Sequence, residues 1–451
     1  MGAIQQRGGR ADEAANRAWV HMKRVLFITY WFPPQPAAGA ARTGYIAEYL
    51  KEFGWEPVVL TREYPGSADF DCRVETVLEP MWFTSRHRNQ PDGIARGRSR
   101  HPLEERVRTL ARAIIRFPDD YSAWMPSALA RAFAIARTTH FDAVLSSAPP
   151  PNVHFLARIV SSRLRLPWVA DYRDLWSGPY GPHFSRYYGP TRLRIYYAME
   201  RWLLRGAARV TTVTKGHAAG LSQNFGRQDV EVIPNASDPS MWDSIEDSRP
   251  ADFRFCYTGQ LYPKLRTPDL LFSAVARLKE MHDAAGIAAR FDFYGNAPEL
   301  TLECAARYGL ADAVRAHGLV DRRVALTAQR KAAVLVLLLN MVDDDDPIEN
   351  ANPGSKIFEY AGAGRRILAL GTSTNIIDRV LQETGLGLFA SDQEGCMAAI
   401  RTLYEYYVRG DIIPSTRSSA WFNTPRDIAR QFAELLDLEM DKKVSGRLNR
   451  T

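Results

Sequence analysis

The chain has 451 residues, of which 46% are apolar and 24% are charged, and this composition excludes a disordered tail, a collagen and a coiled coil. Lys and Arg number 58 against 51 Asp and Glu, so the net charge of +7 favours acidic partners such as phosphates, nucleic acid or an anionic membrane surface. The four cysteines lie far apart with no CxxC pair, which argues against a disulfide scaffold or a structural zinc site and favours a reducing cytoplasm.

The first 21 residues are polar and contain glycine and arginine, so we predict that residues 1–21 form a disordered extension. The fold signal begins directly after Met22, which makes this methionine a candidate for the true start of the protein. The N-terminus lacks the basic-then-apolar pattern of a signal peptide, and no run of 18 apolar residues predicts a membrane-spanning helix.

Alternating strand and helix patterns predict an N-terminal domain over residues 22–234. A β-branched and aromatic run at 23–30 is followed by a loop with glycine, a helix over 41–53 that ends at Gly54, and a strand over 57–61. This order is one βαβ unit of a parallel sheet. Further buried strands are predicted at 143–146, 167–170, 210–213 and 230–233.

A second domain over residues 253–415 is predicted after a polar linker at 235–252. Its predicted strands are 253–258, 290–294, 314–317, 333–339 and 367–370, and its predicted helices are 270–281, 356–363 and 376–384. The tail at 416–451 contains one amphipathic helix over 424–438, whose Thr-Pro start suits an N-cap and a first helical position. We therefore predict an α/β protein with two tandem, doubly wound, Rossmann-like domains.

Five sequence blocks together resemble the group 1 glycosyltransferases, the family-four branch of the GT-B fold. The blocks are FITYWFPPQPAAGAART, SSAPPPNVHFLA with LPWVADYRDLW, VIPNASD, YTGQLYPKLRTPDLLFSA and NPGSKIFEYAGAGRRILAL, and they span most of residues 23–390 in the family's order. The resemblance implies two Rossmann domains that face a central cleft, with the donor nucleotide mainly in the C-terminal one. It also implies a C-terminal helix that returns to the N-terminal domain.

Basic residues follow the strand that opens the second domain. Gly259 ends this strand, and Lys264 and Arg266 lie in the next loop, where two cations suit a diphosphate and the charge on a departing nucleotide. The family usually places a cation directly after the glycine, but this chain has Gln260. Lys264 and Arg266 must therefore provide more of the contacts to the diphosphate. A solvated basic loop is the alternative interpretation.

The last block places a second group of residues near the donor. Gly354 precedes a helix that begins near Lys356, whose free N–H groups would point towards a phosphate or sugar. Glu359 can accept two hydroxyl hydrogen bonds, as ribose recognition needs, although a partner for the helix dipole is the alternative. The resemblance makes Glu359 the second Glu of the family's E-x7-E motif, but Ala351 stands at the first position. The asparagines on either side of Ala351 could substitute, and retention and donor identity stay open.

Gly39 lies in the loop after the first strand, where the backbone can approach an anion, with a plain βα turn as the alternative. This loop is not GxGxxG, so a dinucleotide site is disfavoured. The predicted donor contacts are Gly39, Gly259, Gln260, Lys264, Arg266, Gly295, Gly354, Lys356 and Glu359.

Asp171, Arg173 and Asp174 come just after a buried strand of the first domain, where α/β folds place ligands. Many relatives carry a histidine in this neighbourhood facing the acceptor, and Arg173 takes its place. Asp171 or Asp174 could act as the base towards an acceptor hydroxyl, with Arg173 holding an acceptor phosphate, or the three could form an internal network. His154 is expected to be a packed helix residue. The predicted catalytic residues are Asp171, Arg173, Asp174, Lys264 and Arg266.

Two stretches, 86–116 and 186–206, combine arginine with apolar residues at helical spacing. Such faces suit an anionic bilayer surface, and the predicted membrane or acceptor contacts are Arg192, Arg194, Arg201, Trp202 and Arg205. Helices packed on the first domain with solvated arginines are the alternative, and no nucleic-acid motif accompanies the charge. The run Asp343–Asp346 is expected to be a solvated loop, because consecutive carboxylates cannot all face one metal ion.

The expected function is that of a cytoplasmic glycosyltransferase, peripheral at the inner face of the membrane. It would move a sugar from a nucleotide-diphosphate-sugar to a lipid-linked or glycan acceptor during surface polysaccharide or glycolipid biosynthesis, with retention implied by the resemblance. The nucleotide-sugar is a substrate, and neither a cofactor nor a metal is expected. The alternatives are a nucleotide-sugar epimerase of the same fold, which the basic aromatic helices argue against, and a catalytically silent nucleotide-sugar-binding scaffold.

Overall fold

The computed structural model describes residues 22–35, 38–66, 70–79, 119, 121–176, 190–281, 288–341, 354–372, 376–411 and 421–448. The predicted extension 1–21, the basic stretch 86–116, the run Asp343–Asp346 and the two asparagines beside Ala351 lie outside these residues. The chain divides into two compact units, with divisions near residues 211 and 428.

The first sheet has the strand order β3-β2-β1-β4-β5-β6-β7. Its strands are β1 (Lys23–Thr29), β2 (Trp55–Arg62), β3 (Arg73–Val77), β4 (Ala143–Ala148), β5 (Trp168–Tyr172), β6 (Arg209–Thr212) and β7 (Val230–Val232). The pairing is parallel from β3 to β5, and Phe27 lies between Val59 and Leu145. The residues of β4 and β5 are all buried, as expected where helices cover both faces of a parallel sheet.

The helices that accompany this sheet are α2 (Ala38–Tyr49), α5 (Met125–Thr138), α6 (Asn152–Leu164), α7 (Pro190–Gly206), α8 (Lys215–Phe225) and α15 (Pro425–Leu448). Helix α2 continues as a 3-10 turn and ends at Gly54, whose φ of 82° is a conformation that favours glycine. The predicted end of this helix is therefore confirmed.

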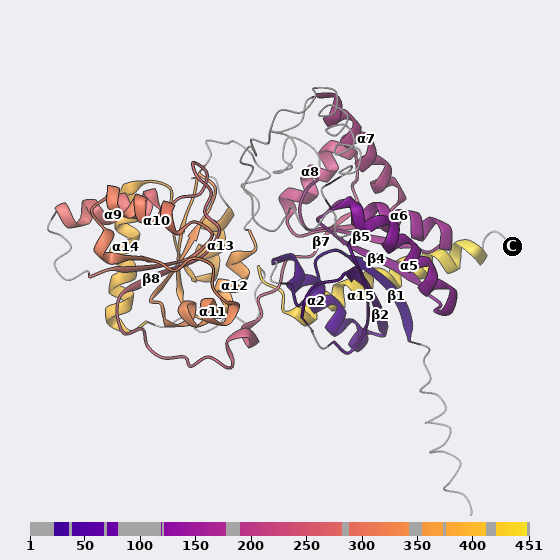
Figure 1. Ribbon diagram of the computed structural model, residues 1–451, viewed down its shortest axis with the longest axis horizontal. Helices are drawn as coiled ribbons and strands as arrows, with labels where there is room; N and C mark the ends of the chain where they lie inside the picture. Colours follow the sequence, from indigo (N-terminus) through magenta and orange to yellow (C-terminus); the bar gives the residue numbers. More distant parts are fainter. Residues whose placement is uncertain are drawn as a thin grey trace, which may run out of the picture. The chain divides into compact units, whose positions relative to one another are not determined.

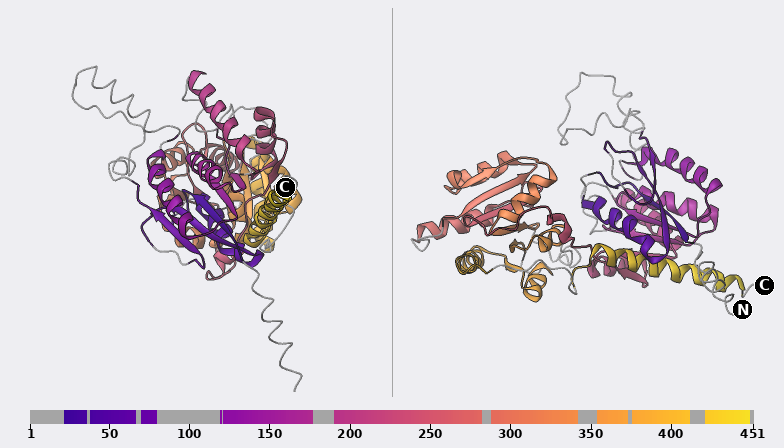
Figure 2. Two further views of the ribbon diagram at one scale, coloured as in Figure 1. Left: turned by 90° about the vertical axis from the view of Figure 1, so that its right-hand side faces the viewer. Right: turned by 90° about the horizontal axis from the view of Figure 1, so that it is seen from below.

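Helix α15 packs along the first sheet from Ala429 onward, as Figure 2 shows. Arg209 donates to Glu439 at 2.7 Å, and Glu439 is buried while the side chain of Arg209 is 11% exposed. Asp437 accepts from the indole of Trp55 at 2.9 Å and from the ammonium of Lys23. These contacts confirm the return of the C-terminal helix to the first domain.

The second sheet has the order β10-β9-β8-β11-β12-β13, with every pair parallel. Its strands are β8 (Arg254–Gly259), β9 (Arg290–Gly295), β10 (Val314–Ala316), β11 (Val334–Leu338), β12 (Arg366–Leu370) and β13 (Gly387–Ala390). This is the doubly wound order in which the winding reverses between the first and fourth strands, so the switch point lies between β8 and β11.

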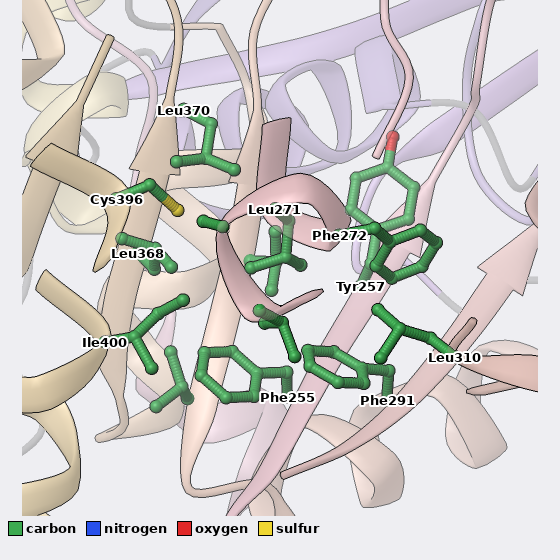
Figure 3. Close-up of a cluster of buried hydrophobic side chains, with 14 of the residues drawn as sticks. Phe255, Tyr257, Leu271, Phe272, Phe291, Leu310, Leu368, Leu370, Cys396 and Ile400 are labelled. Carbon is green, nitrogen blue, oxygen red and sulfur yellow. The ribbon is translucent and has the colours of Figure 1, made fainter. Parts of the chain in front are cut away.

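The helices of the second unit are α9 (Asp269–Glu280), α10 (Pro298–Arg307), α11 (Arg322–Lys331), α12 (Lys356–Ala363), α13 (Ile376–Thr384) and α14 (Gln393–Arg409). Strand residues alternate between the two faces, so Phe255 packs on the face covered by α9 and α14, whereas Cys256 packs on the face covered by α11, α12 and α13 (Figure 1). Figure 3 shows the first of these cores, in which Phe255 and Phe291 stack 5.1 Å apart.

The stretch 235–252, which was predicted as a polar linker, packs on the second unit. Trp242, in the 3-10 turn Pro239–Trp242, is fully buried in the core beside α12. Asp247 accepts from the guanidinium of Arg365 at 2.8 Å. Buried aromatic and ionic contacts therefore fix this stretch to the second unit.

Candidate functional site

Apart from Gly39, which lies in the first unit, the predicted donor residues belong to the second unit, whose switch point lies at the carboxyl ends of β8 and β11. Thr258 and Gly259 end β8, and Asn340 and Met341 follow β11. Ligands of doubly wound sheets bind in this position because the connections before and after the switch point run to opposite faces of the sheet.

The loop after β8 is closed by backbone hydrogen bonds that fix its basic residues. Tyr262 and Arg266 form a bridge, with N···O distances of 3.0 and 2.8 Å, and the N–H of Met341 donates to the carbonyl of Leu265 at 2.7 Å. Lys264 lies at the tip with a φ of 68°, and its side chain is exposed. A non-glycine residue in this left-handed region carries backbone strain, which native structures keep mainly at functional sites.

Arg266 is half-buried and held by its neighbours. Its guanidinium donates to Asn340 Oδ1 at 3.0 Å and lies over the ring of Tyr262, 5.5 Å from the centroid. Its Nε is buried and has no hydrogen-bond partner among the described residues. Burial raises the pKa of the nearby Tyr257 to about 12, so this phenol stays neutral beside the cation.

Gly259 and Gly295 are required by the close approach of the strand ends. A Cβ on Gly295 would overlap the carbonyl oxygen of Gly259, and a Cβ on Gly259 would lie 2.8 Å from the hydroxyl of Tyr257. The amide of Asn296 pins the start of the loop by bonding both the N–H and the carbonyl of Leu261, at 2.8 and 3.2 Å. The loop is therefore anchored at both ends.

Helix α12 brings Glu359 to the same edge of the sheet. Its carboxylate, 18% exposed, accepts from Lys356 Nζ at 2.9 Å and from Gln329 Nε2 at 2.7 Å, and Arg322 lies 3.9 Å away. Burial alone would raise the pKa of Glu359, but Lys356, Gln329 and Arg322 hold it below its ordinary value. Gly354 precedes the helix with a φ of 67°. Glu359 is therefore an ionised acceptor.

Gln329 and Tyr360 join this site although the sequence analysis did not single them out. The Tyr360 hydroxyl accepts from the N–H of Thr258 at 3.0 Å, and Gln329 donates to the Thr258 hydroxyl at 2.8 Å. Gln329 follows the apolar Leu326 by three residues on α11, so it occupies a core-facing helical position. A polar residue at a core-facing helical position was the sequence signal that could have identified Gln329.

In the first unit, Asp171 is fully buried and engaged by its neighbours. Its carboxylate accepts two bonds from Arg42, at 2.9 and 3.0 Å, and one each from Ser147 at 2.7 Å and Thr211 at 2.9 Å. Burial opposes ionisation, but Arg42 and Ser147 hold the pKa of Asp171 below its ordinary value. This geometry favours the internal network over the role of base.

Arg173 is buried as well, and its guanidinium donates to the carbonyls of Gly39, Ala148 and Pro149. Burial lowers the pKa of Arg173 to about 10. This geometry does not favour the predicted contact between Arg173 and an acceptor phosphate. Gly39 packs against Arg173. Asp174, in contrast, is exposed.

His154 is buried on α6, as the helical pattern predicted. The Ser146 hydroxyl lies 2.9 Å from Nδ1 of His154 and accepts from the indole of Trp168 at 2.7 Å. Burial lowers the pKa of His154 to about 3. The imidazole is therefore neutral and packed in the domain core.

Helix α7 exposes one stripe that mixes arginine with apolar side chains. Arg194, Arg201 and Arg205 are exposed on it, and Ile195 and Trp202 are each 46% exposed. Trp202 stacks on Phe155, with 6.1 Å between ring centroids. The side chain of Arg192 lies outside the described residues.

Among the described residues, no helix is long and apolar enough to span a bilayer, and no group of three or more His, Cys, Asp or Glu side chains could hold a metal ion.

Comparisons with known proteins agree with this arrangement. Residues 38–236 match a family profile described as a glycosyl transferase 4-like domain. No curated protein matches the sequence significantly.

Solved structures share the fold over nearly the whole chain. A glycosyltransferase from Rickettsia africae ESF-5 is 13% identical with a TM-score of 0.52, covering 94% of this chain and 97% of that one. WaaG, a glycosyltransferase involved in lipopolysaccharide biosynthesis, is 15% identical with a TM-score of 0.50, covering 93% and 98%. A putative UDP-N-acetylglucosamine 2-epimerase from Listeria monocytogenes is 13% identical with a TM-score of 0.53, covering 93% and 97%.

At these identities the structural likeness establishes the shared fold. The chain therefore has the GT-B fold of two Rossmann-like domains, as the resemblance to the group 1 glycosyltransferases predicted, and the match of residues 38–236 to a glycosyl transferase 4-like domain supports a transferase enzyme.

Proposed function

We propose that the chain transfers a sugar from a nucleotide-diphosphate-sugar to a lipid-linked or glycan acceptor in surface polysaccharide or glycolipid assembly. The observation that carries this proposal is the group at the carboxyl edge of the second sheet: a strained, exposed Lys264, a held Arg266 and an ionised Glu359. Cations for a diphosphate and a carboxylate for ribose hydroxyls are the two contacts that such a donor needs.

In the proposed reaction, an acceptor hydroxyl forms a bond to the anomeric carbon of the donor sugar. The bond from that carbon to the diphosphate oxygen breaks, and its electron pair stays on the diphosphate. Lys264 and Arg266 stabilise this growing negative charge, so their contribution is larger in the transition state than in the bound donor. The nucleotide-sugar is consumed as a substrate, and retention of configuration is what the family resemblance implies.

The hydroxyl proton must pass to a base, and we propose Asp174 for this role. It is exposed at the end of β5, whereas the neighbouring Asp171 is enclosed by Arg42, Ser147 and Thr211. A carboxylate that is exposed to solvent can contact an acceptor hydroxyl, whereas a fully buried carboxylate cannot.

The acceptor is proposed to be presented at the inner face of a membrane, to which the protein binds peripherally through α7. The exposed stripe of this helix places Arg194, Arg201 and Arg205 beside Ile195 and Trp202, which suits lipid headgroups and the upper acyl region. Tyr196 and Leu203 on the same helix are fully buried in the domain. Ile195 and Trp202 therefore carry the apolar contact.

Sedimentation with vesicles tests this membrane proposal. We expect recovery with anionic but not neutral vesicles, weakening as salt rises, because charge attraction is screened within about 8 Å at physiological ionic strength. Changing Arg194, Arg201 and Arg205 to Ser should remove about 3 kcal/mol, or roughly 150-fold, of anionic binding. The matched control changes Arg137, Arg163 and Arg165, which are exposed on or beside α5 and α6, and should bind as the unmodified protein does. Equal recovery with both vesicle types, or equal loss in the control, contradicts the proposal.

The same fold also occurs in an epimerase, so epimerisation of a nucleotide-sugar is the second candidate activity. The exposed basic and aromatic stripe of α7 argues against it, because an epimerase has no lipid acceptor. A silent scaffold that binds a nucleotide-sugar is the third candidate. Formation of a glycosylated product by the purified protein distinguishes transfer from both.

A further inference from the structure

Gln329 is a buried polar residue that connects Glu359 to the end of β8. It lies on α11 and has 0% exposure. Its Nε2 donates to Glu359 Oε1 at 2.7 Å and to Thr258 Oγ1 at 2.8 Å. Thr258 is followed by Gly259 and the basic loop, so one amide group ties the carboxylate of α12 to the strand that opens the donor site.

The orientation of this amide is forced and leaves one atom unpaired. Gln329 Oε1 is buried and has no hydrogen-bond partner within the described part of the chain. A flipped amide would give this position to the nitrogen but would turn the carbonyl oxygen towards the carboxylate of Glu359, which is repulsive. A buried acceptor without a partner is destabilising, so the fold carries a cost here for holding Glu359.

The two oxygens of Glu359 have different surroundings. Oε1 accepts from both Gln329 and Lys356, at 2.7 and 2.9 Å, whereas the cation nearest to Oε2 is Arg322 at 3.9 Å, beyond hydrogen-bond distance. Among the described residues no hydrogen bond reaches Oε2. One oxygen is therefore anchored by the protein and the other keeps its lone pairs available to accept a hydroxyl.

We propose that Gln329 is a positioning residue that locks Glu359 so that Oε2 faces a ribose hydroxyl of the donor nucleotide. This inference rests on the proposed function, because it assigns the ligand of Glu359 to a nucleotide ribose. Gln329 does not touch the ligand. It acts through the carboxylate, by fixing its rotation and by favouring its ionised form.

The effect on ionisation gives a measurable signature. Within the described part of the chain, the charged groups that face Glu359 are Lys356 from α12 and Arg322 from α11, and β8 contributes the Thr258 hydroxyl through Gln329. Burial raises the pKa of Glu359, and the hydrogen bond from Gln329 is one of the interactions that lower it. Without this bond the pKa of Glu359 should rise. Ligand binding should then become more sensitive to acid.

The test is Gln329→Met, which keeps the length of the side chain and removes its hydrogen bonds. Affinity for UDP, GDP and ADP is measured by calorimetry at pH 7.5 and pH 5.5. At each pH the affinity of a variant is compared with that of the unmodified protein, so that the effect of protonating the diphosphate is the same in both and cancels. We expect about tenfold weaker binding of the nucleotide that the unmodified protein prefers, with a larger loss at pH 5.5. The thermal midpoint should change little, because the loss of the bond to Glu359 opposes the gain from removing the unpaired carbonyl.

The matched control is Gln382→Met on α13, where Gln382 makes a similar bond to Asp378 at 2.8 Å on the exposed surface. This variant should bind nucleotides normally at both pH values. The second control places Gln329→Met in a Glu359→Ala background, where it should cause no further loss, because a positioning residue has nothing left to position.

Three outcomes decide the matter. Unchanged affinity of Gln329→Met at both pH values overturns the positioning role, as does an equal loss in the Glu359→Ala background. Failure of the unmodified protein to bind any of the three nucleotides overturns the proposed function and the inference with it. A tenfold, acid-sensitive loss that vanishes in the Glu359→Ala background supports both.

Discussion

Replacing Lys264 with glycine should separate the catalytic contribution of this residue from its contribution to stability. Lys264 is exposed at the tip of the loop closed by Tyr262 and Arg266, and its φ of 68° lies in the left-handed region. Glycine adopts this conformation without steric cost. The substitution therefore relaxes the backbone while it removes the cation.

The two effects have opposite signs. A left-handed residue with a Cβ costs roughly 1–2 kcal/mol, and glycine costs about 0.5–1 kcal/mol in extra conformational entropy, so Lys264→Gly should stabilise the fold by about 0.5–1 kcal/mol. Loss of a charge-assisted contact to the diphosphate, worth about 1.5–3 kcal/mol, should lower turnover roughly 10- to 150-fold.

Two further variants isolate each effect. Lys264→Ala keeps the strained backbone, so it should lose the same turnover without gaining stability. Arg165 is the other described non-glycine residue with positive φ, at 54°, and it caps α6 on the exposed surface. Arg165→Gly should therefore gain stability with unchanged turnover.

Urea unfolding and steady-state rates measure the two quantities on the same samples. A drop in stability for Lys264→Gly would refute the strain argument. Turnover equal to that of the unmodified protein would refute the role of Lys264 in stabilising the leaving diphosphate. If the Michaelis constant rises while turnover stays constant, the cation acts in ground-state binding only.

Three other substitutions test the remaining parts of the site. Glu359→Ala should weaken nucleotide binding by about 1.5–3 kcal/mol in calorimetry, and Glu383→Ala on the exposed face of α13 should not; equal affinities would remove Glu359 from the donor site. Asp174→Asn should lower the rate of sugar transfer while donor binding is kept, and transfer at the wild-type rate by this variant contradicts the assignment of Asp174 as the base. Asp171→Asn should instead lower the free energy of unfolding, because it breaks the buried ion pair with Arg42. Because burial lowers the pKa of His154 from 6.5 to about 3, its contribution to stability is complete above pH 6.5 and is lost as the pH falls, by about 2 kcal/mol at pH 5. His154→Gln should flatten this dependence, and identical stability–pH curves would show that His154 does not cause it.

The strands at the centre of each sheet were predictable because they are buried on both faces and consist of continuous β-branched and aliphatic runs. The edge strands β3 and β13 were not predicted. β3 alternates Arg73 and Glu75 with apolar residues, and β13 begins at Gly387, so neither forms an apolar run. Polar residues and glycine weaken the composition signal of β3 and β13, whereas the edge strands β7 and β10 were predicted.

Lys264 and Arg266 were predictable as candidate donor residues because they lie in the loop that directly follows β8, at the carboxyl edge of the sheet. Glu359 lies on α12, and it was singled out by its position near the start of a helix and by the family resemblance. Gln329 was not, because its role depends on Thr258, 71 residues upstream, and Glu359, 30 residues downstream. Contacts of this kind exist only once α11 and α12 pack on the sheet.

The predicted acceptor residues show where sequence patterns stop being informative. Asp171 and Asp174 are three residues apart, and spacing gave no reason to prefer one. Asp171 turns inward because Arg42, 129 residues upstream, meets it in the core. The same limit applied to α7, where Tyr196 and Trp202 have similar chemistry, but only Trp202 is exposed.

The most direct test of the proposed transferase activity is product analysis with purified protein, a panel of nucleotide-diphosphate-sugars and anionic vesicles that carry lipid-linked acceptors. We expect one donor to release its nucleoside diphosphate in equal amount with a glycosylated acceptor seen by mass spectrometry, and we expect both signals to fall together in Lys264→Ala. A nucleotide-sugar that binds without releasing its diphosphate would contradict transfer and favour the silent scaffold. A nucleotide-sugar that is recovered with an inverted sugar centre, without a glycosylated acceptor, would contradict transfer and favour the epimerase.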